Sequence, residues 1–329
     1  MHGLNLSIVI VNWNSGTQLR ECLASLDASA AQLPACCALQ QVVVVDNGSL
    51  DGSDQRLVVQ CGQLHLIRNA VNRGFAVACN QGAAGLESEL ILFLNPDTRL
   101  FDDSLAAPVN LLQRPDHARS GIVGIAMVDD SGHVVPSCAR YPRAWHFASH
   151  ALGLDRLWPR AGHYMLEWDH AQTRQVDQVI GAFFMIRRDL FEALAGFDER
   201  FFVYFEEVDL ALRARQAGWA SVHLAEASAY HKGGGTSSSV KDVRLFYSLR
   251  SRLQYGNKHY SLPERLLLWL VTFALEPISR MAHLAIVGRW REVRQVAAAY
   301  AMLSRPWLDP SRAVSSSDPL APDTGKRVQ

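Results

Sequence analysis

Short, almost uninterrupted apolar runs that alternate with helical patterns constrain the fold of this chain most strongly. The runs cover residues 6–11, 41–45, 64–67 and 90–94. After the first run, Leu19, Leu23 and Leu26 recur at the spacing of one helix face. Strands buried on both faces have continuous apolar runs, and strands separated by helices pair in parallel. The sequence therefore predicts an α/β fold with a mainly parallel sheet covered by helices.

The rest of the chain divides into an irregular segment, further strands and helices, and a separate C-terminal part. We expect a loop leading into a helix over 72–82, an irregular excursion over 129–175, a strand over 176–186, helices over 188–195 and 207–217, and a strand over 221–224. The glycine- and serine-rich residues 233–239 fit either a flexible linker or a lid that orders on a ligand. The chain is then helical and basic to about Arg305, and disorder is expected from Asp309.

Charge is balanced over the whole chain but not along it. Residues 1–240 carry 18 Lys and Arg against 25 Asp and Glu, whereas residues 241–329 carry 14 against 7. A net charge of zero gives no bulk attraction to nucleic acid, so we expect no nucleic-acid partner. A basic C-terminal part beside an acidic body instead favours an anionic partner or surface for that part.

Cysteine spacing and hydropathy indicate the compartment. The six cysteines form no C-x-x-C pair and show no zinc spacing, so we expect reduced thiols in the cytoplasm. The N-terminus leads almost directly into the first strand, without the pattern of a secretion signal. No apolar window reaches about 18 residues, so a membrane-spanning helix is not expected.

Polar clusters follow three of the apolar runs. They are Asn12-Trp13-Asn14, Asp46-Asn47-Gly48-Ser49 and Asn95-Pro96-Asp97. Each one alone is explained as an ordinary turn, because Asn, Asp and Gly favour turns. Three such clusters at strand ends fit a polar crevice better, since ligands of open parallel sheets bind beyond the carboxyl ends of the strands. A carboxylate there can accept from a ribose or base, and Asp97 can hold a divalent metal on a phosphate.

The segment Phe201–Leu210 places three carboxylates within four positions directly after an aromatic run. Acidic residues suit the first turn of a helix, which is the simplest explanation. Like charges this close also raise each other's pKa, and such groups often act as a base or hold a metal.

Together these motifs resemble the inverting nucleotide-sugar glycosyltransferases of family 2, most closely the bacterial rhamnosyltransferase-like members. Each motif is weak alone, but their order and spacing over about residues 6–235 are specific. The matching segments are 7–14, 45–49, 72–76, 94–97, 181–185, 196–199, 201–210 and His231. The resemblance implies the GT-A fold, in which a Rossmann-like nucleotide half joins an acceptor half. The expected domains are a catalytic domain over 1–238 that divides near residue 128, a helical module over 239–308 and a tail over 309–329.

The same resemblance implies a site for the nucleotide-sugar donor. Asp46 would contact the nucleoside. Asn95-Pro96-Asp97 takes the place of the family's D-x-D motif with Asn at its first position, so Asp97 would hold Mg²⁺ or Mn²⁺ and the diphosphate. His231, which would otherwise be an ordinary surface or core histidine, would ligate the metal or contact the diphosphate. The predicted donor-binding residues are Asn12, Asp46, Asn72, Gly74, Asn95 and Asp97.

The family's catalytic base is the acidic residue that follows Glu in a Glu-Asp motif, and Glu207 occupies that position here. It would deprotonate the acceptor hydroxyl opposite the leaving diphosphate. Glu206 and Asp209 are expected to orient neighbouring groups or to act structurally, since a residue two positions from Glu207 on a helix points elsewhere.

The basic C-terminal part contains a ten-residue apolar run, Leu266–Leu275. It is too short to cross a bilayer. It fits a core helix packed on the catalytic domain, or an interfacial helix that neighbouring arginines hold against anionic headgroups at the inner face of the cytoplasmic membrane.

The function predicted from these observations is inverting transfer of a sugar from a nucleotide diphosphate to a saccharide or lipid-linked acceptor in cell-envelope polysaccharide synthesis. The first choice of donor, from the resemblance alone, is dTDP-L-rhamnose. Alternatives are a hexosyl or N-acetylhexosaminyl donor, or an inactive nucleotide-binding or scaffold protein. A nicotinamide-dependent dehydrogenase would need G-x-G-x-x-G after the first strand, and residues 12–17 lack it.

Overall fold

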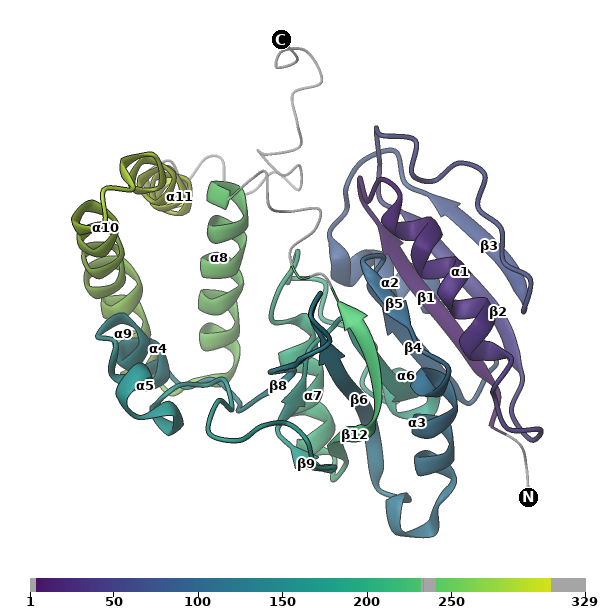
Figure 1. The fold of residues 1–329 in the computed structure, drawn as a ribbon. Helices are drawn as coiled ribbons and strands as arrows, with labels where there is room; N and C mark the ends of the chain where they lie inside the picture. The colour runs from purple at the N-terminus through teal and green to yellow at the C-terminus, as the bar shows by residue number, and fades with distance from the viewer. Residues whose placement is uncertain (1–3, 232, 234–240, 309–329) are drawn as a thin grey trace.

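The protein is described by a computed structural model that covers residues 4–231, 233 and 241–308. Figure 1 shows a strongly twisted sheet with helices on its faces and a separate group of helices beside it. Within the described residues, ten strands form one mixed sheet with the central order β3-β2-β1-β4-β11-β6-β12-β5. The expected sheet flanked by helices, followed by a C-terminal helical region, is confirmed.

The parallel half of the sheet comes from the N-terminal third of the chain. Its strands are β1 (Leu6–Asn12), β2 (Leu39–Asp46), β3 (Gln63–Arg68) and β4 (Leu90–Leu94). β1 pairs in parallel with both β2 and β4, and Asn12 lies beside Asp46 in that register. These four strands lie where the apolar runs predicted them.

The second half of the sheet is mixed. Its strands are β5 (Thr98–Leu100), β6 (Ser120–Val128), β7 (Val134–Val135), β9 (Arg174–Val176), β11 (Phe183–Arg187) and β12 (Ala220–His231). β11 runs antiparallel to β4 and β6, and β12 pairs with β6 in parallel and with β5 antiparallel. β8 (Cys138–Ala139) and β10 (Gln178–Val179) form a small second sheet.

Alternate residues of the parallel strands pack against helices on opposite faces. Ile8 and Ile10 lie in one core with α1 (Gln18–Ala30) and α3 (Asp103–Gln113), and η1 (Pro115–His117) follows α3. Val9 and Val11 lie in the other core. The helices of that second face are α2 (Phe75–Ala83), α6 (Arg188–Ala193) and α7 (Glu206–Gln216). Burial on both faces explains the continuous apolar runs of β1, β4 and the second half of β2, whereas the edge strand β3 is partly exposed.

Three sequence expectations differ from the structure. The single strand expected over 176–186 is three short strands, because the chain leaves β9, forms β10 and turns at Gly181 before β11. The last strand continues from Ala220 to His231, so His231 lies in the strand rather than after it. No element was expected between residues 101 and 119, where α3 lies, or over the long buried strand β6.

The helical region combines two distant stretches of chain. Its C-terminal elements are α8 (Lys241–His259), α9 (Leu262–Leu270), the π-helical turn η3 (Val271–Leu275), α10 (Glu276–Ile286) and α11 (Trp290–Leu308). The excursion supplies α4 (Ala144–Ala151), α5 (Leu154–Leu157) and η2 (Pro159–Ala161). Ala144 and Phe147 share a core with residues of α8, α9 and α11. The expected lid or linker and the tail from Asp309 lie outside the described residues, apart from Gly233.

Candidate active site

The carboxyl ends of β1 and β2 carry a buried hydrogen-bond network. The Asn12 amide donates to Asp46 Oδ1 at 2.7 Å and to Ser53 Oγ at 2.9 Å, and Asp46 Oδ2 accepts from the Ser49 backbone N–H at 3.1 Å. Asn12 is fully buried and Asp46 almost so. Asn12 thus fixes the Asp46 carboxylate from beneath, at the position where sequence analysis placed a donor contact.

A second network holds the loop before α2. The Asn47 amide donates to Asn72 Oδ1 at 2.8 Å and to the Gly74 carbonyl at 3.1 Å, and Asn47 Oδ1 accepts from the Arg73 backbone N–H at 3.0 Å. The sequence predicts Asn72 and Gly74 as donor-binding residues, whereas it assigns no such role to Asn47. The signal was present, since Asn47 belongs to the same strand-end cluster as Asp46.

The end of β4 lies beside the end of β12. The Asn95 backbone N–H donates to the Ala182 carbonyl at 3.0 Å, and the β5–β12 register pairs Thr98 with His231. This register brings His231 Nε2 to 3.4 Å from Asp97 Oδ1, and both side chains are largely covered, with 16% and 10% of their surface exposed. Two residues separated by more than 130 positions therefore meet, as the metal-site hypothesis requires.

The Asp97–His231 pair has the donor set for a divalent cation. Carboxylate oxygen and imidazole nitrogen bind such ions at roughly 2.0–2.2 Å, so two ligands of one ion lie about 3–4 Å apart. The 3.4 Å separation fits this range. Two protein ligands leave coordination positions for diphosphate oxygens and water, which is how Mg²⁺ is usually held.

The segment that precedes α7 is held in an unusual backbone conformation. Tyr204 and Phe205 have φ values of 68° and 70°, which bulky residues rarely adopt. The Phe202 carbonyl accepts a hydrogen bond from the Phe75 backbone N–H at 2.6 Å. This bond ties the segment to the loop before α2, which we call the donor loop. Strain of this kind concentrates at functional sites, where it sets the direction of side chains.

Glu206 and Glu207 are the first two residues of α7, and their carboxyl groups are shielded from solvent. Burial and the charge of Glu207 raise the pKa of Glu206 well above its ordinary value. Burial also raises the pKa of Glu207, while backbone N–H groups of the first helical turn act in the opposite direction. The Oε2 atom of each of the two side chains is buried without a hydrogen-bond partner among the described residues. The pair can therefore hold a proton at neutral pH.

Asp209 differs from Glu206 and Glu207 because basic side chains surround its carboxylate. Its carboxylate accepts from Lys258 and His259 at 2.6 Å and from Arg213 Nε at 2.7 Å. Burial alone would raise the pKa of Asp209, but these donors lower it overall. Asp209 joins α7 to α8 and is fully buried, so its position is that of a structural anion.

Gly181 and Ala182 lie between the loop after β4 and the start of α7. Ala182 bonds to Asn95, and an ideal Cβ placed on Gly181 would lie 4.0 Å from Glu207 Cγ. Partial burial and the charge of Glu207 raise the pKa of Tyr164, which is 52% exposed. Sequence analysis missed Tyr164 because it lies in the irregular excursion, about 40 residues before Glu207.

Comparisons with known proteins agree with this architecture. The sequence profile of Glycosyl transferase family 2 matches residues 7–195. An N-acetylglucosaminyl-diphospho-decaprenol L-rhamnosyltransferase of Mycobacterium tuberculosis is 31% identical over 240 residues, covering 69% of this chain and 75% of the relative. A low-salt glycan biosynthesis hexosyltransferase of Haloferax volcanii is 26% identical over 216 residues, covering 64% and 62%.

One solved structure shows the same fold. The mannosyltransferase PcManGT from Pyrobaculum calidifontis, in complex with GDP-Man and Mn²⁺, superposes with a TM-score of 0.52 at 16% identity, covering 95% of this chain and 79% of that one. The likeness confirms the expected GT-A fold. The family profile ends before Phe201, so the roles of Glu207 and His231 depend on the geometry described above.

The contact between Gly74 and Phe202 gives a first prediction. Gly74 has a φ of 91°, and an added Cβ would lie 2.7 Å from the Phe202 carbonyl oxygen, so Gly74→Ala should displace the donor loop. We expect at least a tenfold loss of nucleoside diphosphate affinity by calorimetry. Gly85→Ala is the matched control, since Gly85 has a φ of 74° and open space around its Cβ position. Equal affinity in both variants would show that this contact does not shape the site.

Proposed function

The chain belongs to glycosyltransferase family 2, and on that premise we propose that it transfers a sugar with inversion from a nucleotide diphosphate to an acceptor hydroxyl, with Glu207 as the base. The observation that carries this proposal is the pair of carboxyl groups at the start of α7. Burial raises the pKa of both groups, and the charge of Glu207 raises that of Glu206 further, so in this proposal Glu206 holds a proton and Glu207 accepts the one from the acceptor. The neutral neighbour and the apolar surroundings keep Glu207 basic enough for the reaction.

The reaction follows from these positions. Glu207 takes the proton of the acceptor hydroxyl as that oxygen attacks C1 of the donor sugar, and the bond from C1 to the diphosphate oxygen breaks on the opposite side. The nucleoside diphosphate leaves, and the configuration at C1 inverts. Asp97 and His231 would hold a divalent cation, which offsets the charge on the leaving diphosphate.

The donor occupies the edge formed by β1, β2 and β4 in this proposal. Asp46 would accept hydrogen bonds from the nucleoside, with Asn12 fixing its carboxylate. Asn72, Gly74 and Asn95 would shape the diphosphate path. Tyr164 and the aromatic residues before Glu206 would wall the acceptor side.

We propose L-rhamnose from dTDP-L-rhamnose as the donor sugar and a lipid-linked saccharide as the acceptor, in cell-envelope polysaccharide synthesis. The name of the mycobacterial relative supports both. The Haloferax relative supports the alternative of another hexosyl donor. Mass-spectrometric screening of nucleotide sugars for donor hydrolysis distinguishes them, and hydrolysis of none would favour the inactive scaffold.

Glu207 provides the test of the mechanism. Glu207→Gln keeps the shape but removes the basicity, so transfer should fall by roughly 10²–10⁴-fold while donor binding stays unchanged. In the parent enzyme, kcat/KM should rise with pH through the raised pKa of Glu207, because only the ionised carboxylate accepts a proton.

Two further variants make this test specific. Glu206→Gln should keep most of the activity, since Gln resembles the protonated acid, and Glu207→Asp should keep part of it. If Glu206→Gln abolished transfer and Glu207→Gln did not, the wrong carboxylate would have been named.

The cation gives another prediction. Nucleoside diphosphate should bind in the presence of Mg²⁺ or Mn²⁺ and lose at least tenfold in affinity with chelator or in Asp97→Ala, measured by calorimetry. The Mn²⁺ in the mannosyltransferase complex supports a divalent ion on this fold. Asp102→Ala, at an exposed acid just before α3, is the control. Equal affinity with and without chelator would remove the cation from the mechanism.

We also propose that the helical region attaches the enzyme to an anionic membrane surface. No helix in the described part of the chain is long and apolar enough to cross a membrane. The continuous helix from α9 to α10 buries Leu268 and Val271 but exposes Leu266, Leu270 and Ile278, each by more than 60%. The helix therefore combines the two alternatives from the sequence, with one side in the core and the other side apolar and uncovered.

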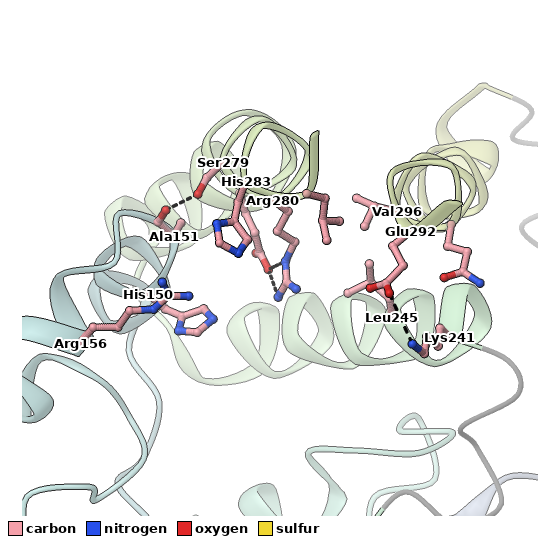
Figure 2. A pocket seen from close by; sticks show the side chains of 13 residues that line it. His150, Ala151, Arg156, Lys241, Leu245, Ser279, Arg280, His283, Glu292 and Val296 are labelled. Carbon is pink, nitrogen blue, oxygen red and sulfur yellow. Dashed lines mark hydrogen bonds and ion pairs between the residues drawn. The ribbon is translucent and has the colours of Figure 1, made fainter. Parts of the chain in front are cut away.

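The helical region also contains a cavity lined by charged side chains. The cavity, of about 300 Å³, lies between α4, α5, α8, α10 and α11 (Figure 2). Lys241, Arg156 and Arg280 line it together with two histidines, against the carboxylates of Glu276 and Glu292. Exposed apolar side chains match the acyl boundary of a bilayer, and the excess of Lys and Arg over residues 241–329 suits its anionic headgroups.

Liposome sedimentation tests the membrane proposal. The protein should sediment with anionic vesicles at low salt, less at high salt, and not with neutral vesicles. The double variant Leu270→Glu/Ile278→Glu should reduce binding at least tenfold. Leu50→Glu/Val58→Glu, at equally exposed positions in the nucleotide half, should not. Failure to sediment with anionic vesicles at low salt would refute the proposal.

A further inference from the structure

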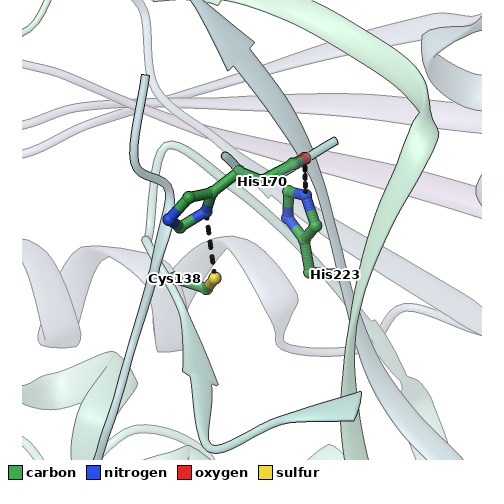
Figure 3. A group of neighbouring side chains, drawn as sticks. All are labelled: Cys138, His170 and His223. Atoms are coloured by element: carbon green, nitrogen blue, oxygen red, sulfur yellow. Dashed lines mark hydrogen bonds between the residues drawn. The ribbon is translucent and has the colours of Figure 1, made fainter. Parts of the chain in front are cut away.

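Cys138, His170 and His223 form a buried cluster that shares no residue with the Asp97–His231 pair or the Glu206–Glu207 pair. Cys138 lies in β8, His170 in the loop before β9 and His223 in β12, and each side chain is at most 1% exposed. One ligand atom from each residue lies within 4.8 Å of the others. Figure 3 shows the two imidazole rings and the thiol facing one small volume.

Backbone carbonyls fix the tautomers of both histidines. His170 Nε2 lies 2.9 Å from the Met165 carbonyl oxygen, and His223 Nε2 lies 2.9 Å from the His170 carbonyl oxygen. A carbonyl oxygen only accepts, so each Nε2 carries the hydrogen and each Nδ1 presents a lone pair. This is the arrangement of metal-binding histidines, whose second nitrogen donates to a carbonyl.

The two Nδ1 atoms differ in their partners. His170 Nδ1 lies 3.2 Å from Cys138 Sγ, so a thiol hydrogen bond satisfies it. His223 Nδ1 is buried and has no hydrogen-bond partner among the described residues. An ordinary polar core would satisfy both nitrogens, and the unpartnered lone pair indicates that a further group belongs in the cluster.

We propose that Cys138, His170 and His223 bind one Zn²⁺ ion as a structural site. Two imidazole nitrogens and a thiolate suit zinc in tetrahedral coordination, whereas Mg²⁺ and Mn²⁺ prefer oxygen. The site is thus chemically distinct from the Asp97–His231 pair. Glu167 is a candidate for the fourth position, because its Oε2 is buried without a hydrogen-bond partner among the described residues while its Oε1 pairs with Arg140.

Zinc binding would displace one proton to solvent. Burial raises the pKa of Cys138 to about 12, so the metal-free thiol is protonated at neutral pH. Burial also lowers the pKa values of His170 and His223, which keeps both imidazoles neutral. Zinc would replace the thiol proton, and its affinity should rise with pH.

The position suggests what the ion would do. Cys138 and His170 bracket the segment that contains α4, α5 and Tyr164, while His223 belongs to the central sheet. A single ion would therefore fasten both ends of this segment to β12. In the proposed function Tyr164 of this segment lines the acceptor side, so the position of the segment matters there.

Metal analysis of the full-length protein tests the site. After growth with zinc and desalting, plasma mass spectrometry should find about one zinc per chain in the parent and in Cys79→Ala, a cysteine as deeply buried as Cys138. Cys138→Ala and His223→Gln should retain less than a tenth of it. In His223→Gln the side-chain amide can still donate to the His170 carbonyl, but it offers no imidazole Nδ1 to the metal. Asp97→Ala should keep its zinc.

Two readouts separate loss of metal from loss of fold. Cobalt(II) in place of zinc should give a thiolate charge-transfer band that Cys138→Ala lacks. Zinc added to the stripped parent should raise its Tm by about 5 °C, with no rise in Cys138→Ala. A parent without stoichiometric zinc, copper in its place, or equal zinc in parent and Cys138→Ala would overturn the proposal.

Discussion

Burial of the central sheet on both faces is the constraint on which the rest of the structure depends. Because helices cover both sides of β1, β2 and β4, polar side chains along these strands are costly, and the buried Ser7 hydroxyl in β1 is an exception without a partner among the described residues. Polar groups are therefore collected at the carboxyl ends of the strands, where Asp46 and Asn95 lie. Parallel pairing brings these ends to one edge, so the architecture that needs apolar strands also creates the crevice for the donor.

The aromatic segment before α7 converts this edge into a site with two sides. Its backbone is strained at Tyr204 and Phe205, and its Phe202 carbonyl binds the donor loop. The same turn delivers Glu206 and Glu207 to the start of a helix, where burial raises their pKa values and the first-turn amides moderate the rise for Glu207. Asp209 stabilises the turn from below through Lys258 and His259, so the helical region supports the position of the proposed base.

The sequence predicted the parts of this arrangement that depend on local patterns. The strands of the parallel half, α1 and the polar strand ends follow from apolar periodicity and turn chemistry. Strand β6 escaped prediction because Gly121 and Gly124 interrupt its pattern, although Gly124 is required where an added Cβ would lie 2.6 Å from Val179. The packing of α4 on α9 depends on partners more than 100 residues away, which no local pattern reports. Asp97 and His231 could be linked only through family resemblance, because register between distant strands brings them together.

Most buried side-chain atoms without a hydrogen-bond partner among the described residues lie outside the nucleotide half, although Ser7 Oγ in β1 is also one of them. Glu206 and Glu207 each keep a shielded oxygen without a partner among the described residues, and so does His223 at Nδ1. The donor side differs, since Asn12 and Asp46 belong to one hydrogen-bond network and Asn47 belongs to a second one with Asn72 and Gly74. A preformed network suits a nucleotide, which is bound in the same way at every turnover. Unsatisfied groups are costly in a folded chain and persist where a proton, a ligand or a metal completes them, so the acceptor side is the half of this fold whose chemistry depends on what binds there.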